Sequence, residues 1–221
     1  MSVSSFRFIG DLQLKATPWC LGLFGWLACG LANPAQAVTA TITNSPASIY
    51  LQVGVGNFGN GFFTGGTAAG NNALINQVTA TVPAGSLGGG PVGMTTNSTI
   101  TRSSYDNFVF CTVPAQVYFG GFLRSGNNAA STATLSATAP AALVNAAGDS
   151  IAFNTVSWVS GGNADPVATI PSGTFTGATQ TLLNMGSNTW FESCLQFSYS
   201  NSQLVGAGTY SGRVRYTLTA P

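Results

Sequence analysis

Histidine is absent from this chain of 221 residues, and charged residues make up only 5% of it. Nucleophilic catalysis by serine or cysteine needs a base that accepts the proton, usually histidine, so a serine hydrolase is not expected. Six basic and five acidic residues give a net charge of +1. That charge is too small for the basic surface of a nucleic-acid-binding protein or of a protein held on anionic lipid. The composition therefore predicts neither an enzyme nor a nucleic-acid partner.

Long apolar runs are also lacking, except near the N-terminus. There the run Trp19–Ala28 follows a weakly basic stretch and precedes small residues that end at Ala37. This order is typical of a secretory signal peptide, here residues 1–37, cleaved after Ala37. The run is shorter than the roughly 20 residues that cross a bilayer, so no membrane span is expected once the signal peptide is removed. Lipidation at Cys29 stays an alternative, because Leu27–Gly30 resembles a bacterial lipobox.

The predicted cleavage leaves a mature chain, residues 38–221, with two cysteines and no lysine. Cys111 and Cys194 are then the only pair in an exported protein, and we expect them to form a disulfide. Closing a loop of that length stabilises a fold by about 4–5 kcal/mol in the chain-entropy model. Nothing in the mature chain resembles a linker, so it is expected to form a single domain.

The hydrophobic periodicity of the mature chain is two rather than 3.6, which is typical of half-buried strands. Strands are expected at residues 38–43, 49–55, 74–82, 96–102, 107–113, 116–124, 131–138, 151–159, 173–176, 191–199 and 208–219. Clusters of glycine, asparagine, serine and proline between them mark turns. Only residues 140–147 are compatible with a short helix. Many short strands separated by turns predict an all-β sandwich or barrel.

Few residues are left that could hold a metal or act on a substrate. A calcium site would have to use Asp149, Asp165 and Asn163, but lone acidic residues in such loops are usually turn residues. Asp106 and Glu192 would be the carboxylate pair of a glycoside hydrolase, and two isolated surface carboxylates are the better interpretation. We therefore predict no catalytic residue, no cofactor and no metal.

Three aromatic residues offer a different function. Trp158, Trp190 and Tyr118 would form a stacking platform for sugars, as in a secreted carbohydrate-binding module. Large aromatic side chains at alternating strand positions belong more often to the core. The platform is therefore the alternative hypothesis.

The two ends of the mature chain carry the clearest strand patterns. In residues 208–219 the apolar positions alternate with polar ones, so that one face is buried and the other is wet; the apolar positions are Tyr210, Val214, Tyr216 and Leu218. Next to the cleavage site, Val38, Ala40 and Ile42 alternate with threonines. A free strand of this kind is what one chain needs to complete a sheet in its neighbour.

The C-terminal segment GTYSGRVRYTL (208–218), together with residues 197–201 and 148–153, resembles subunits of chaperone-usher pili, particularly the spore coat U-like pilins. Gly208 matches the glycine that other such pilins carry fourteen residues from the end, and Ala220 stands where they have an aromatic residue. The resemblance implies an immunoglobulin-like β-sandwich that lacks one strand. A periplasmic chaperone lends this strand, and the N-terminal extension of the next subunit then replaces it.

The expected protein is thus an exported structural or adhesive component of the cell surface, a fimbrial (pilus) subunit. Residues 38–43 would be its donor strand, and residues 208–219 would border the acceptor groove. Its partners would be other pilus subunits, a periplasmic chaperone and an usher, and a surface glycan. It would pass through the periplasm to the fimbrium or the extracellular surface.

Overall fold

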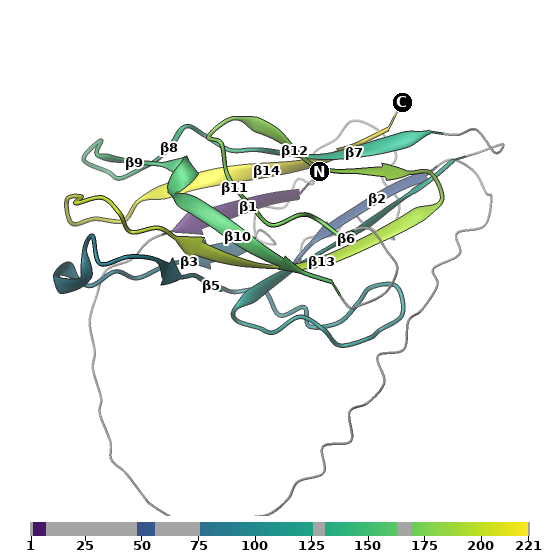
Figure 1. Ribbon diagram of the computed structural model, residues 1–221, viewed down its shortest axis with the longest axis horizontal. Coiled ribbons are helices and arrows are strands. Elements are labelled where there is room, and N and C mark those ends of the chain that lie inside the picture. The colour runs from purple at the N-terminus through teal and green to yellow at the C-terminus, as the bar shows by residue number, and fades with distance from the viewer. Residues whose placement is uncertain (1, 8–47, 56–75, 126–130, 163–168, 221) are drawn as a thin grey trace, which may run out of the picture.

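The computed structural model describes residues 2–7, 48–55, 76–125, 131–162 and 169–220. These residues form two sheets that pack face to face as the layers of a sandwich (Figure 1). The prediction of an all-β sandwich is confirmed. Among the described residues, no helix is long and apolar enough to span a membrane.

Sheet A is the larger layer, with the strand order β12-β7-β14-β1-β3-β5 and a β8–β9 hairpin beside β14. Its strands are β1 (Ser2–Arg7), β3 (Gln77–Thr79), β5 (Thr95–Thr96), β7 (Thr132–Thr138), β8 (Ala142–Val144), β9 (Ser150–Ala152), β12 (Thr179–Gly186) and β14 (Ser211–Thr219). Neighbouring strands are antiparallel except for β1 and β3, which are parallel.

Sheet B has the strand order β11-β10-β13-β6-β2, with β4 paired to one end of β13. Its strands are β2 (Ser48–Val53), β4 (Val92–Gly93), β6 (Gln116–Arg124), β10 (Val156–Gly161), β11 (Gly173–Thr174) and β13 (Thr189–Tyr199). β13 has 11 residues and lies between β10 and β6. The strand pairs of sheet B are antiparallel.

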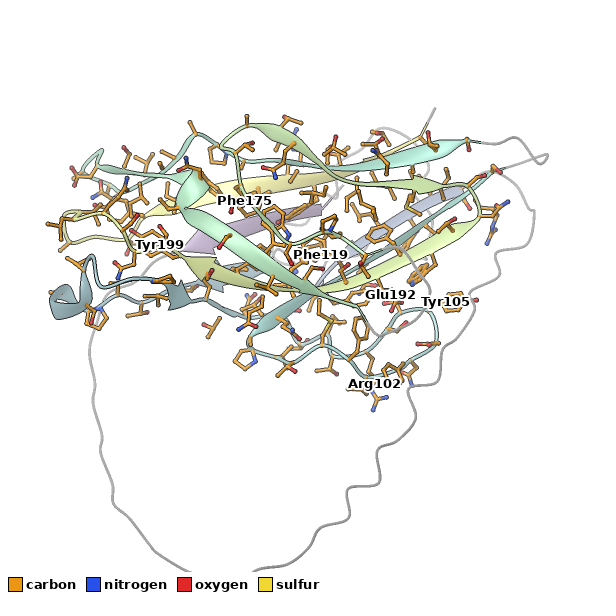
Figure 2. All side chains as sticks on the ribbon, viewed as in Figure 1. Arg102, Tyr105, Phe119, Phe175, Glu192 and Tyr199 are labelled. Carbon is orange, nitrogen blue, oxygen red and sulfur yellow. A yellow bond between two sulfur atoms is a disulfide. The ribbon has the colours of Figure 1, made fainter. Side chains whose placement is uncertain are left out.

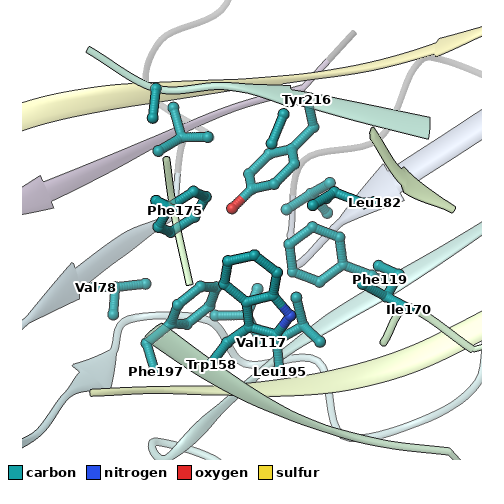
Figure 3. Close-up of a cluster of buried hydrophobic side chains, with 14 of the residues drawn as sticks. Val78, Val117, Phe119, Trp158, Ile170, Phe175, Leu182, Leu195, Phe197 and Tyr216 are labelled. Carbon is teal, nitrogen blue, oxygen red and sulfur yellow. The ribbon is translucent and has the colours of Figure 1, made fainter. Parts of the chain in front are cut away.

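Aromatic side chains fill the space between the two sheets (Figure 3). The ring of Phe175 lies 4.8 Å from that of Trp158, and the ring of Phe119 lies 4.9 Å from that of Tyr216. The second pair joins β6 of sheet B to β14 of sheet A. Such tilted and edge-to-face pairs add to the free energy gained by burying their apolar area. The apolar positions of the period-two pattern are thus the ones that the strands bury between the sheets.

The segment 140–147, for which a short helix was considered, is instead the first arm of the β8–β9 hairpin. Leu143 is fully buried and Val144 is exposed, which is the alternation of a strand. The Asn145 side chain accepts hydrogen bonds from the backbone N–H groups of Ala147 and Asp149 and so closes the turn. Asparagine favours such turns because its side chain bonds to the nearby backbone.

The expected strands also differ from the observed ones elsewhere. The strand expected at 151–159 is two strands, β9 and β10, which a 3₁₀ turn at Phe153–Thr155 separates and which belong to different sheets. Residues 97–115 form a long loop rather than two strands, apart from a single bridge between Arg102 and Val109. Conversely, the structure contains a strand that the sequence did not predict, β12. Its pairing with β7 shifts between Thr181 and Leu183, and this bulge breaks the alternation by which strands are recognised.

Two buried tyrosines of the core are expected to respond in opposite directions to loss of their hydroxyl groups. The Tyr216 hydroxyl is buried without a hydrogen-bond partner among the described residues, whereas that of Tyr118 donates to Glu192 and accepts from the backbone N–H of Ser104. An unsatisfied buried polar group costs about 1–3 kcal/mol. Tyr216→Phe should therefore leave the free energy of unfolding unchanged or raise it, and Tyr118→Phe should lower it by about 1 kcal/mol. Urea unfolding of both variants measures the difference, and a loss of stability in Tyr216→Phe would contradict this assignment.

Candidate functional site

The position between β14 and β3 in sheet A is the candidate site, and we call it the strand slot. β14 pairs with β7 along one edge, and β3 pairs with β5 along one edge. The other edges of β14 and β3 face the slot and do not pair with each other, because β1 lies between them (Figure 1). Sheet A is therefore continuous only while a strand occupies the slot.

β1, which occupies the slot, comes from the first residues of the chain. It runs antiparallel to β14, from Ser2 opposite Tyr216 to Arg7 opposite Ser211. It runs parallel to β3, with Ser5 opposite Gln77. These first residues belong to the segment 1–37 that the sequence predicts is cleaved off on export. Cleavage would leave two strand edges with unpaired main-chain groups, which are costly when buried and prone to pair with another chain.

The floor of the slot is apolar. Val214 and Tyr216 of β14 and Val78 of β3 are buried beside the slot, and Phe119 of β6 lies beneath Tyr216. The expected alternation of the C-terminal strand is confirmed, because Val214, Tyr216 and Leu218 are buried while the residues between them are more exposed. Tyr210 just precedes β14, and its hydroxyl donates to the carbonyl oxygen of Gly206. The predicted donor residues Val38, Ala40 and Ile42 lie outside the described residues.

A second feature lies on the outer face of sheet B, where residues 97–115 form what we call the capping loop (Figure 2). The expected disulfide between Cys111 and Cys194 is confirmed, and it joins this loop to β13. Tyr118 lies in β6 directly opposite Cys194. The loop and the disulfide together cover polar side chains that would otherwise face solvent.

Glu192 is the central residue beneath the capping loop and is only 1% exposed. Its Oε1 atom accepts hydrogen bonds from Ser103 Oγ at 2.5 Å, Trp190 Nε1 at 2.5 Å and Tyr118 OH at 3.2 Å. Ser103 belongs to the loop, whereas the other two donors belong to sheet B. Glu192 thus ties the loop to the sheet.

The tyrosine hydroxyl reaches Glu192 because Gly120 leaves room for it. A side chain at Gly120 would begin 2.2 Å from the Tyr118 hydroxyl oxygen. Gly120 lies between Gln52 of β2 and Glu192 of β13 in the strand register. Gln52 is held on its side by Tyr50 OH and Ser104 Oγ, which both donate to its Oε1 atom. A polar row therefore crosses three strands under the loop.

Burial raises the pKa of the Glu192 carboxyl above its ordinary value, and the charge of Asp106 adds to this effect, while the three hydrogen bonds oppose it. Burial likewise raises the pKa of the Tyr118 hydroxyl, and the Glu192 charge adds to the increase. The dominant cause for both groups is loss of hydration, which disfavours their charged forms.

The three aromatic residues proposed for sugar stacking are buried, with exposed fractions of 4% for Trp158, 5% for Trp190 and 0% for Tyr118. Trp158 packs in the core and donates through Nε1 to the carbonyl oxygen of Pro171. Trp190 stacks with Tyr50 and Phe122. A platform made of these three residues is therefore wrong, because none of them presents a free ring face.

The acidic residues weighed as catalytic or metal-binding groups are placed differently. The interpretation of Asp106 and Glu192 as isolated surface carboxylates is wrong, because Glu192 is buried under the capping loop and lies near enough to Asp106 for their charges to interact. Asp149 accepts a hydrogen bond from Asn145 Nδ2 in the β8–β9 turn. Asp165 and Asn163 lie outside the described residues, and in the described part of the chain no three potential metal ligands cluster.

No protein-family model, curated protein or solved structure matches this chain.

The raised pKa of Glu192 predicts how stability depends on pH. A carboxyl whose pKa is raised by folding stabilises the fold fully below its unfolded pKa, near the ordinary value of 4.5. That contribution is lost as the pH rises through the raised pKa. The Glu192→Gln variant keeps an oxygen acceptor and does not titrate. The free energy of unfolding of the wild type minus that of the variant should therefore fall as the pH rises from below 4.5 towards neutrality. Urea titrations across this range test it, and parallel curves for the two proteins would overturn it.

Proposed function

We propose that the protein is an exported structural subunit of a bacterial cell-surface fimbrium, joined to its neighbours by strand pairing in the slot. One observation carries the proposal: the slot is filled by a strand from the very segment that the sequence predicts is removed on export. Once that segment is gone, another strand has to satisfy the edges of β14 and β3. These two edges would then pair with the backbone of a partner.

Residues 38–43 have the alternation of apolar and polar residues that suits the slot. In β1 the positions opposite Tyr216, Val214 and Gly212 are held by Ser2, Ser4 and Phe6. Residues directly opposite each other in an antiparallel pair lie on the same face. If residues 38–43 entered in the equivalent register, the alternating residues of the predicted donor strand, Val38, Ala40 and Ile42, would take these inward positions. Apolar side chains would then meet the apolar floor.

β14 and β6 run in the same general direction across the sandwich. This direction decides whether residues 38–43 of the same chain, or those of another copy, can fill the slot. Tyr216 lies against Phe119 of β6. Towards the start of β14, Gly212 lies beside Phe153. The rings of Phe153 and Phe175 are 5.2 Å apart, and Phe175 in turn stacks with Phe197. Phe197 follows Gln196, which pairs with Gln116, the first residue of β6. The end of β6 therefore lies beyond the end of β14.

Residues 38–43 of the same chain cannot fill the slot in the direction of β1. Their last residue would lie opposite Ser211 at the start of β14, whereas β2 begins at Ser48, which pairs with Arg124 at the end of β6. Some ten strand positions separate these two levels, about 34 Å. The intervening residues 44–47 reach at most about 18 Å. A strand in this direction must therefore come from another copy of the chain.

This arrangement agrees with the resemblance of the C-terminal segment to chaperone-usher pilins. A slot with an apolar floor needs protection before assembly, which is the role of a periplasmic chaperone. We accordingly propose a periplasmic chaperone, an usher and other fimbrial subunits as partners. The mature protein would pass through the periplasm and end in the fimbrium.

A charge at an inward position of the donor strand should block assembly. In the full-length precursor, Ile42→Asp would place a carboxylate on the apolar floor of the neighbour's slot, where an unpaired charge is strongly disfavoured. Thr41→Asp is the matched control, because it adds the same charge on the outward face. Fibres counted by electron microscopy, and oligomers separated by size-exclusion chromatography, should disappear with Ile42→Asp and persist with Thr41→Asp.

Two results would contradict the proposal. One is undiminished fibre formation by Ile42→Asp. The other is an intact mass for the exported protein that still includes Ser2–Arg7, since the slot would then be filled by its own chain.

A further inference from the structure

Three of the exposed large apolar side chains gather in one short part of the capping loop, residues 102–109, which we call the loop tip. Tyr105 and Phe108 are each 42% exposed and Val109 is 49% exposed. The other strongly exposed apolar residues of the described chain, Val144, Val159 and Leu204, lie in separate parts of the sequence. Single exposed apolar residues are ordinary, but a cluster usually marks a contact surface.

The backbone of the loop tip is fixed by its own hydrogen bonds. The N–H of Ser103 donates to the carbonyl oxygen of Phe108 at 2.8 Å, and the N–H of Asn107 donates to that of Ser103 at 3.2 Å. Asp106 Oδ1 accepts from the N–H of Phe108, and Arg102 Nη1 donates to the carbonyl oxygen of Asn107. Ser103 is also tied to the buried Glu192. The exposed side chains thus project from a backbone that is already ordered, which lowers the entropy cost of binding.

The ring of Tyr105 is supported from below. Its centroid lies 5.4 Å from that of the buried Trp190, which itself stacks with Phe122 and Tyr50. Figure 2 shows Tyr105 at the rim of the molecule, near Glu192. A ring that is held in place on one side and exposed on the other can receive a flat ligand at little cost in side-chain entropy.

We propose that the loop tip is a saccharide-binding site. The aromatic rings of Tyr105 and Phe108 suit the C–H face of a sugar ring, while Asp106 and Asn107 in the same turn offer a carboxylate and a carboxamide for its hydroxyl groups. A stable protein partner needs about 20–30 residues on each side, far more than this narrow turn presents. The tip carries one basic and one acidic residue, Arg102 and Asp106, so it lacks the positive charge that binds nucleic acid.

The site is independent of the proposed assembly. The loop tip lies over sheet B, whereas the strand slot lies in sheet A. A subunit whose slot is filled would keep its loop tip exposed. Failure of saccharide binding would consequently leave the assembly proposal intact, and the reverse also holds.

The test is binding of the full-length protein to an array of immobilised neutral and acidic oligosaccharides, followed by titration of the strongest binder in solution. We expect binding to at least one glycan, and a loss of about tenfold or more in affinity for Tyr105→Ala and for Phe108→Ala, as for other aromatic anchors. Tyr105→Phe should retain binding, because the ring is kept. Val159→Ala and Leu204→Ala are the matched controls, since they remove exposed apolar side chains elsewhere and should bind as the wild type does.

Several results would overturn the site. They are binding to none of the glycans, equal affinities for the wild type and the Phe108→Ala variant, or an equal loss in the two control variants. Phe108→Ala decides the matter if Tyr105→Ala fails to fold, because among the ring contacts given by the structure only Tyr105 packs on Trp190 from the loop tip.

Discussion

Sheet A depends on one interaction, the backbone pairing along the edge of β14 that faces the slot. β14 links the β12–β7 pair to the slot, and beyond the slot only the short strands β3 and β5 continue the sheet. Without a strand in the slot, sheet A would separate into two parts, and the main-chain groups of β14 and β3 that face the slot would lose their partners. Backbone pairing does not depend on which side chains the strand carries, so any strand with a suitable alternation of apolar and polar residues can satisfy these edges.

Sheet B does not share this dependence. Its strands pair without any contribution from residues 2–7, and the disulfide between Cys111 and Cys194 holds the capping loop to β13. The two layers are thus expected to differ in local stability, since elements that are incomplete without a partner open at a lower free energy. The proposed assembly site would then lie in the less stable layer, and the proposed saccharide-binding loop on the more stable one.

The sequence predicted β6 with the bounds that the structure has, 116–124, because no bulge disturbs its alternation. The search for alternating residues missed β12, because the register shifts between Thr181 and Leu183 and the extra residue, Leu182, interrupts the alternation. The pattern also separated Phe191 and Leu195, which face the core, from Glu192 on the opposite face. It had no means of showing that residues 97–115 fold back over that face, because this depends on contacts such as that of Ser103 with Glu192, which are 89 positions apart. The occupant of the slot was equally beyond reach, since local patterns do not show which strands become neighbours.

The scarcity of charge has a structural consequence at the edges of the sheets. Proteins commonly protect free strand edges from unwanted pairing with charged side chains, prolines or bulges. The edge strand β12 contains no charged residue and has a bulge between Thr181 and Leu183. Of the two edges that face the slot, that of β14 carries Arg213 and Arg215 on its exposed face, but its pairing with β1 is without a register shift. The short strand β3 contains no charged residue and no proline. If the proposed cleavage removed residues 2–7, these edges over an apolar floor would be an aggregation hazard in a monomer. The proposed assembly therefore requires that another strand cover them from export to incorporation in the fibre.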